Sequence, residues 1–114
     1  KIHKVYAVVD CGRTVNPSNG ENQIQGGIVM GLSTAMGEAI TLEKGAVMQT
    51  NFADYPILKM SGAPATIDVH FIESGAPMGG LGEPGVPPAA PALANALFAV
   101  TGKRIRQLPI VAIS

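Results

Sequence analysis

The sequence predicts an α+β fold of the split β-α-β, or ferredoxin-like, type, with the element order βαββαβ and two helices packed on one face of the sheet. Three observations support this expectation. Short runs rich in β-branched and aromatic residues at 5–9, 46–50 and 65–73 are typical of strands. Longer runs at 19–40 and 88–100 repeat their apolar residues every three or four positions, as amphipathic helices do. Glycine and proline separate these runs where turns are expected.

The composition indicates a single domain over residues 1–114, because a chain of this length can build only one compact core. Hydrophobic residues make up 46% and charged residues only 14%, with a net charge of zero. This balance argues against electrostatic binding to nucleic acid, and it suggests surface that is buried elsewhere. No apolar run approaches the roughly 18 residues of a membrane span. The lone Cys11 excludes an internal disulfide and argues against a zinc or iron–sulfur site.

The first helix is expected to begin near Asn19, because Ser18 and Glu21 fit a capping box. Its apolar stripe extends to about Ile40 and comprises Ile24, Ile28, Leu32, Ala35, Met36 and Ala39. The same helix contains four glycines, Gly26, Gly27, Gly31 and Gly37. Each glycine weakens a helix by about 1 kcal/mol relative to alanine. Such a cost is reasonable where another element or a cofactor must approach the helix backbone closely.

The second half of the chain is expected to contain a strand, a helix and a strand. Residues 65–73 alternate between an apolar face and a mixed face. The apolar face comprises Ile67, Val69 and Phe71. The helix at 88–100 has its prolines in the first turn and Gly102 at its expected end. A last strand is expected at residues 107–113.

An unusual segment, GGLGEPGVPP at residues 79–88, precedes the second helix. It contains four glycines, three prolines and one charged residue, Glu83. Glycine permits close approaches and proline fixes φ, so the segment can hold one carboxylate in a set direction. Two roles fit this pattern equally well. The carboxylate could cap the following helix, or it could be a catalytic group just ahead of the helix N-terminus.

The glycines also invite comparison with dinucleotide-binding loops. Gly80, Gly82 and Gly85 match the spacing G-x-G-x-x-G. Glu83, however, puts a negative charge where a pyrophosphate would lie, and Pro84 removes a backbone donor. The positions about twenty residues further on are basic, where an acidic residue would bind the ribose. The sequence therefore disfavours a dinucleotide-binding loop.

The same segment, together with the run PPAAPALANAL at residues 87–97, resembles the C-terminal part of the large, molybdenum-cofactor-binding subunit of the xanthine dehydrogenase/aldehyde oxidase family. Within that family the likeness is greatest to bacterial isoquinoline 1-oxidoreductase β subunits. The resemblance implies a C-terminal fragment of a molybdopterin-binding domain in a larger subunit. It also implies an oxidoreductase that hydroxylates an N-heteroaromatic or aldehyde carbon with oxygen from water, the fragment alone being inactive.

The resemblance assigns roles to five residues. A glutamate matching Glu83 acts as general base and takes the proton from the hydroxyl that attacks the substrate carbon. In the stretch QIQGGIVMG a glutamine hydrogen-bonds the pterin, with Gln23 as first choice and Gln25 as second. Gly80 and Gly82 bring the backbone close to the molybdenum ligands. No protein side chain is expected to bind the metal itself.

The resemblance further implies a molybdenum-pterin cofactor, in its cytosine dinucleotide form, and a small partner subunit whose [2Fe–2S] clusters receive the electrons. The rest of the large subunit is another expected partner. Two other functions stay open, a nicotinamide- or flavin-dependent enzyme and a scaffold domain without chemistry. Glu83 and Pro84 argue against the former, and a scaffold, unlike a base, tolerates glutamine at position 83. The substrate, the electron acceptor and the compartment, cytoplasm or periplasm, stay open.

Overall fold

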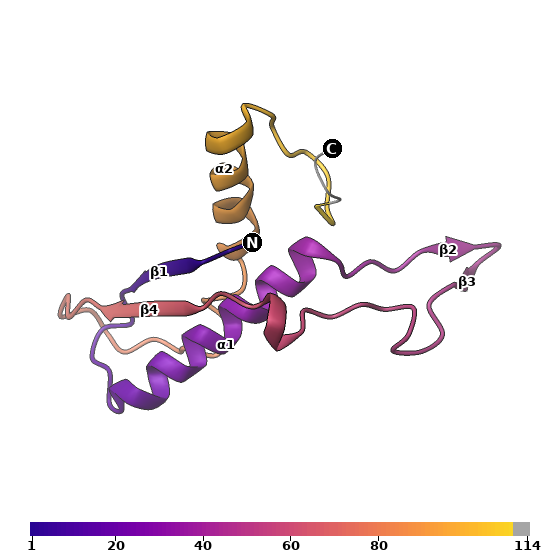
Figure 1. Ribbon diagram of the computed structural model, residues 1–114. Helices are drawn as coiled ribbons and strands as arrows, with labels where there is room; N and C mark the ends of the chain where they lie inside the picture. The colour runs from indigo at the N-terminus through magenta and orange to yellow at the C-terminus, as the bar shows by residue number, and fades with distance from the viewer. Residues whose placement is uncertain (111–114) are drawn as a thin grey trace.

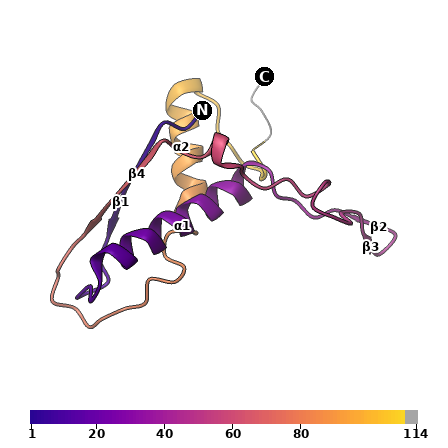
Figure 2. The same cartoon turned by 60° about the horizontal axis from the view of Figure 1, so that its bottom comes forward.

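The computed structural model describes residues 1–110 and shows a β-α-β unit that carries a second helix and a protruding arm (Figure 1). The strands β1 (Lys4–Val9) and β4 (Thr66–Phe71) are neighbours in a two-stranded parallel sheet. Helix α1 (Pro17–Met36) follows β1 and packs against the sheet. Figure 2 shows the strands and α1 as two layers side by side.

The core lies between α1 and one face of the sheet. Both strands contribute side chains to this face: Val5, Ala7, Val9, Ile67, Val69 and Phe71. They pack against a buried cluster of Ile24, Ile28, Leu32 and Ala89. The predicted apolar face of residues 65–73 is thus confirmed, and that of the first helix is confirmed as far as Ala35. Its expected extension to Ile40 is wrong, because the helix ends at Met36 and both Met36 and Ile40 are exposed. The opposite face of the sheet is open, with Tyr6 73% and Val8 65% exposed.

Helix α2 (Ala89–Thr101) packs on α1, and within the described residues its backbone does not approach either sheet strand. Its first residue, Ala89, belongs to the core cluster, and Leu93 packs against that cluster. The helix ends at Gly102, which has φ 70° and donates its N–H to the Phe98 carbonyl. This left-handed residue confirms the helix end predicted from the sequence.

An arm projects from the C-terminal end of α1 (Figures 1 and 2). Its tip is an antiparallel hairpin of β2 (Leu42–Glu43) and β3 (Ala46–Val47), whose turn residues Lys44 and Gly45 both have positive φ. Such a turn matches the twist of paired strands. The short 3-10 helix η1 (Met60–Gly62) then leads the chain back to β4.

Glu38 fastens the arm to α1. Its carboxylate accepts hydrogen bonds from the Ser33 hydroxyl and from the Tyr55 hydroxyl, the latter at 3.0 Å. The Ser33 Oγ in turn accepts the Leu58 N–H at 2.8 Å. The bond to Glu38 raises the pKa of Tyr55, because it favours the protonated phenol. The returning segment of the arm is therefore tied at two points to one end of α1.

The predicted ferredoxin-like order is wrong for the described residues. In a split β-α-β unit another strand separates the two parallel strands, whereas β1 and β4 pair directly from Lys4↔Thr66 to Val9↔Phe71. The strand expected at 46–50 shrinks to β3, which pairs only within the arm. The expected packing of two helices on one sheet is also wrong, because only α1 covers it. The α+β class and both helices are confirmed.

The boundaries of α1 also differ from the prediction. Asn16, not Ser18, caps the helix, with its Oδ1 accepting the Asn19 N–H at 3.1 Å. Pro17 explains this choice, because proline suits the first helical position and leaves the capping role to the residue before it. The last strand, expected at 107–113, falls partly outside the described residues, and its described part, 107–110, contains no strand.

Candidate functional site

The site lies where β1 and β4 end and α1 begins. In parallel α/β units ligands bind at the carboxyl ends of the strands, because the connecting loops gather there. Asp10 ties the loops after the two strands together: its Oδ1 accepts the Gly12 N–H at 3.1 Å and the Ser74 hydroxyl at 2.8 Å. These two bonds, that of Gly12 first, hold the pKa of Asp10 below its usual value.

The loop at residues 79–88 runs back along α1 from this end toward α2 (Figure 2). It is held at its start by the Gly79 N–H, which donates to the Cys11 carbonyl at 2.9 Å. In its middle the Gln23 Nε2 donates to the Gly82 carbonyl at 3.0 Å. Two residues that the sequence singled out separately are therefore in direct contact.

The second half of the loop lies directly on the α1 backbone at Gly85. A Cβ atom at Gly85 would stand 2.7 Å from the Ile24 carbonyl oxygen, and one at Gly31 would stand 2.5 Å from the Val86 carbonyl oxygen. Neither distance is possible for a real side chain. The helix glycines therefore admit this loop, which is the element that approaches the helix backbone. Gly26 and Gly37 do not contact the loop: Gly26 has nothing within 4 Å, and Gly37 follows the end of α1 and faces Pro56.

Glu83 is exposed at the turn between these two attachments. Its carbonyl oxygen accepts the Val86 N–H at 2.9 Å, but within the described residues no hydrogen bond or ion pair engages its carboxylate. The N-cap of α2 is Pro88, and no side chain caps that helix. The interpretation of Glu83 as a helix cap is therefore wrong. The backbone of the loop is fixed, whereas the Glu83 carboxylate has no partner within the described residues.

Gly80 and Gly82 differ from the packed glycines. A Cβ atom added at either position would have no other atom within 4 Å, and neither residue has a positive φ. Nothing in the described part of the chain therefore requires glycine at these two positions. A group that comes close to the backbone from outside this chain would require it.

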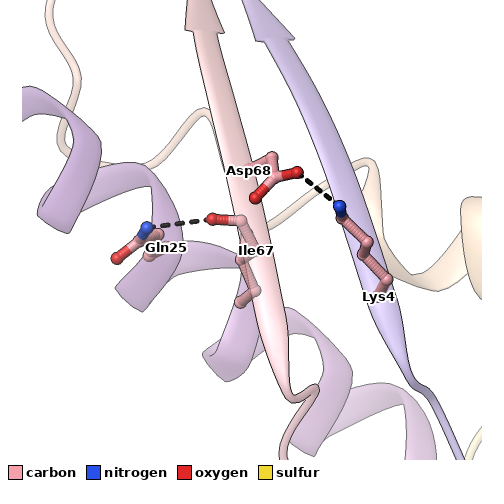
Figure 3. A network of polar contacts seen from close by, with 4 residues as sticks. All are labelled: Lys4, Gln25, Ile67 and Asp68. Carbon is pink, nitrogen blue, oxygen red and sulfur yellow. Dashed lines mark hydrogen bonds and ion pairs between the residues drawn. The ribbon is translucent and has the colours of Figure 1, made fainter.

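Gln25 occupies a different environment from Gln23. Its Nε2 donates to the Ile67 carbonyl at 2.9 Å (Figure 3). The same nitrogen lies 3.4 Å from the Glu21 carboxylate. It thereby caps a backbone acceptor on the outer edge of β4. Figure 3 also shows the ion pair of Lys4 with Asp68 across the sheet, at 2.8 Å. Gln25 thus has a structural partner, and of the two glutamines only Gln23 reaches the loop.

A groove of about 470 Å³ opens beside the loop, between it and the first turns of α1. Its lining residues are Cys11, Arg13, Thr14, Val15, Asn16, Asn19, Gly20, Gln23, Met78, Gly79 and Leu81. Arg13, to which the sequence assigned no functional role, brings a cation to this groove from the loop that follows β1. Gln23 stands at the edge shared by the groove and the loop.

A profile of the molybdopterin cofactor-binding domain matches residues 1–64. The chain belongs to this family. The β subunit of isoquinoline 1-oxidoreductase from Brevundimonas diminuta is 38% identical over 109 residues, which cover 96% of this chain and 14% of that protein. The xanthine dehydrogenase molybdenum-binding subunit of Escherichia coli O157:H7 is 33% identical over 96% of this chain and 15% of its own length.

The fold of this molybdopterin-binding chain also matches a solved relative. Quinoline 2-oxidoreductase from Pseudomonas putida 86 superposes with a TM-score of 0.81 at 29% identity, over 92% of this chain and 14% of that one. The chain thus spans about a seventh of the proteins that it matches. Its relatives are large subunits of molybdenum-dependent oxidoreductases of the xanthine dehydrogenase family.

The residues of this site fit a molybdenum-pterin cofactor. Gln23 uses its Nε2 on the loop, and within the described residues its Oε1 has no partner, which leaves an acceptor for a pterin N–H. The backbone at Gly80 and Gly82 is bare on the side where a side chain would stand. Within residues 1–110 no three His, Cys, Asp or Glu side chains gather around a point where they could hold a metal ion. No helix in this range is long and apolar enough to cross a membrane.

Proposed function

We propose that this chain is part of the large subunit of a molybdenum hydroxylase that inserts an oxygen from water at a carbon of an N-heteroaromatic ring or an aldehyde, with Glu83 as the general base. The observation that carries this proposal is the unpartnered Glu83 carboxylate on a loop that is fixed to α1 on both sides. Isoquinoline and quinoline appear in the names of two relatives, and both are N-heteroaromatic.

Gln23, Gly80 and Gly82 are the residues proposed to hold the cofactor, Gln23 through its amide and the glycines through close backbone approach. Gln25 is the weaker candidate because Ile67 and Glu21 already occupy its amide nitrogen. When bound, the cofactor would supply the oxidation by accepting the hydrogen of the broken substrate C–H bond together with both electrons of that bond. The electrons then leave through [2Fe–2S] clusters on a small partner subunit.

Glu83 supplies the proton transfer. A carboxylate oxygen of Glu83 accepts the proton of the hydroxyl whose oxygen forms the new bond to the substrate carbon, and it later returns that proton to solvent. An ionised carboxylate is needed for this role, and a fixed backbone on either side limits the directions it can take. A positioned general base accelerates such a step by about 10² to 10⁴.

The test is the single-turnover rate of the intact enzyme with Glu83→Gln, measured on an N-heterocycle at matched molybdenum content. Glutamine keeps the size and shape of the side chain but cannot accept the proton. We expect a loss of roughly a hundredfold or more with the metal retained. Glu73→Gln is the matched control, because it removes an exposed carboxylate from the same connection between β4 and α2. An unchanged rate in Glu83→Gln would overturn the proposal.

The proposed cofactor is the cytosine dinucleotide form of molybdopterin, and the proposed extent of the domain, residues 1–114, is the C-terminal part of a larger cofactor-binding domain. Support comes from the resemblance to bacterial isoquinoline 1-oxidoreductase, which is 38% identical. Acid hydrolysis of the purified enzyme should release cytidine monophosphate in a near-equal ratio to molybdenum. Release of another nucleotide, or of none, would contradict this form of the cofactor.

A second candidate function is that of a scaffold domain that assembles a larger complex without taking part in chemistry. The observation that favours it is the exposure of apolar side chains on the arm and on the segment that leads back from it to β4. Phe52 and Met60 are each 88% exposed. A scaffold predicts that Glu83→Gln leaves the single-turnover rate unchanged. It further predicts that polar substitutions at Phe52 and Met60 reduce the yield of assembled enzyme.

A further inference from the structure

We propose that Gln23 is a positioning residue for Glu83: by donating to the Gly82 carbonyl it fixes the loop that carries the general base to helix α1. This inference rests on the proposed function, because it matters for turnover only if Glu83 is the base. It assigns Gln23 a task within the protein itself, in addition to any contact with the cofactor.

The first observation is the bond itself. The Gln23 Nε2 and the Gly82 carbonyl oxygen are 3.0 Å apart and come from positions 59 residues apart in the chain. Gly82 directly precedes Glu83, so the peptide plane that receives this bond also sets the start of the Glu83 backbone. Within the described residues no other donor reaches the Gly82 carbonyl.

The second observation is that the bond forms one half of a clamp. On the other side of Glu83 the loop is held at Gly85, which lies against the α1 backbone at Ile24 and Ile28. Only Glu83 and Pro84 stand between the two attachments, and proline fixes its own φ. Both attachments are to the same helix. The Glu83 carboxylate is therefore positioned relative to α1. Ahead of Glu83, Gln23 supplies the polar attachment, and Leu81 adds an apolar contact with α1 at Gly20.

The third observation is that the nitrogen and the oxygen of the Gln23 side-chain amide are used differently. Only the Nε2 of Gln23 is used by the loop, and its Oε1 has no partner within the described residues. An amide both donates and accepts, so one side chain can hold the base loop while its oxygen accepts a bond from a bound pterin. Asparagine offers the same two functions but is one methylene shorter.

The experiment compares Gln23→Met with Asn22→Leu in the intact enzyme. Met is close to glutamine in length and carries no charge and no donor. Asn22→Leu makes the same amide-to-apolar change at the neighbouring exposed position, which has no described contact with the loop. Three kinds of measurement are made on each variant. The first gives molybdenum and pterin content, the second gives kcat and KM on an N-heterocycle, and the third gives the hydrogen-exchange rate of backbone amides at residues 79–86.

For Gln23→Met we expect, at matched molybdenum content, a KM within about twofold of the wild type and a kcat lowered roughly ten- to a hundredfold, because small misplacements of a catalytic group have effects of that size. Exchange at residues 79–86 should rise about two- to tenfold, the factor that one ordinary hydrogen bond controls. Asn22→Leu should match the wild type in all three.

Two results would overturn the proposal. Unchanged loop exchange together with lost molybdenum or pterin would make Gln23 a cofactor contact only. Unchanged exchange and unchanged kcat would show that the bond does not position the loop. Glu83→Gln, run in parallel, separates this failure from failure of the proposed function: if Glu83→Gln retains full activity, Glu83 is not the base, whatever Gln23 does.

Discussion

Gly27 of α1 and Gly85 of the loop lie in direct backbone contact: a Cβ atom added at Gly27 would stand 3.3 Å from the Gly85 Cα. Both residues are buried, although Gly85 belongs to an otherwise exposed loop. This contact brings the backbone of the loop at Gly85 directly onto the backbone of α1. The position of Glu83 is therefore set by α1, the same helix whose Gln23 bonds the residue before it.

Alanine substitutions on α1 should separate the packed glycines from the open one. Gly26→Ala should stabilise the helix by up to about 1 kcal/mol, because the position is exposed and has nothing within 4 Å. Gly31→Ala should destabilise by about 1–3 kcal/mol, because its Cβ would collide with the Val86 carbonyl and the Ala89 side chain. Native-state hydrogen exchange of α1 amides in the intact subunit measures both. Equal effects of the two substitutions would contradict the close packing.

Gln25→Leu should lower stability without affecting turnover. The substitution leaves the partly buried Ile67 carbonyl without its side-chain donor, at a cost of about 1–3 kcal/mol. Exchange of β4 amides should therefore increase, while kcat and molybdenum content stay at the wild-type level. Loss of pterin from this variant would show that Gln25 contacts the cofactor, as its neighbour Gln23 is proposed to do.

Ser74→Ala should raise the pKa of Asp10 toward its usual value. Asp10 has a lowered pKa in the folded state, so its contribution to stability is present above its unfolded pKa of 3.8 and is lost as the pH falls through the lower, folded value. Without the Ser74 hydroxyl, this contribution should be smaller and its loss should be complete at a higher pH, because the folded pKa then lies closer to 3.8. Acid unfolding followed by circular dichroism checks this. An unfolding curve identical to the wild type below pH 3.8 would contradict it.

Tyr55→Phe should release the arm from α1. The substitution keeps the ring and removes the hydroxyl that bonds Glu38 at 3.0 Å. Limited proteolysis should then cut the arm faster than in the wild type, while α1 stays protected. Raising the pH should have the same effect: the folded pKa of Tyr55 is raised, so the anchor is present below the unfolded pKa and is lost as the pH rises through the folded value. Equal cleavage rates for variant and wild type would contradict this role.

The sequence predicts the local elements of this fold better than their pairing. The alternation of Ile67, Val69 and Phe71 and the stop at Gly102 depend on local chemistry, and both were predicted correctly. The direct pairing of β1 with β4 joins segments about sixty residues apart, and no local pattern specifies it. The run at 46–50 has strand composition, but the turn at Lys44 and Gly45 supplies its partner within the arm.

The sequence proposed residues for the site but could not indicate their contacts. The glycines of the first helix indicated a close approach, and at Gly27 and Gly31 the structure identifies the approaching element as the loop at Gly85 and Val86. The sequence could not indicate that the Gln23 amide would bond Gly82 while Gln25 turned to β4. Two residues apart on a helix, these side chains point about 160° from each other, and only the position of the sheet decides which side is inward.

The central claim, that Glu83 acts as the base, is tested most directly by the pH dependence of kcat/KM for the wild type and for Glu83→Gln at matched molybdenum content. A rate that depends on one ionised carboxylate falls as the pH is lowered, and the position of this fall belongs to the free enzyme. We predict that the wild type shows this acid limb and that the residual activity of Glu83→Gln does not. An acid limb of unchanged position in Glu83→Gln would mean that another group accepts the proton.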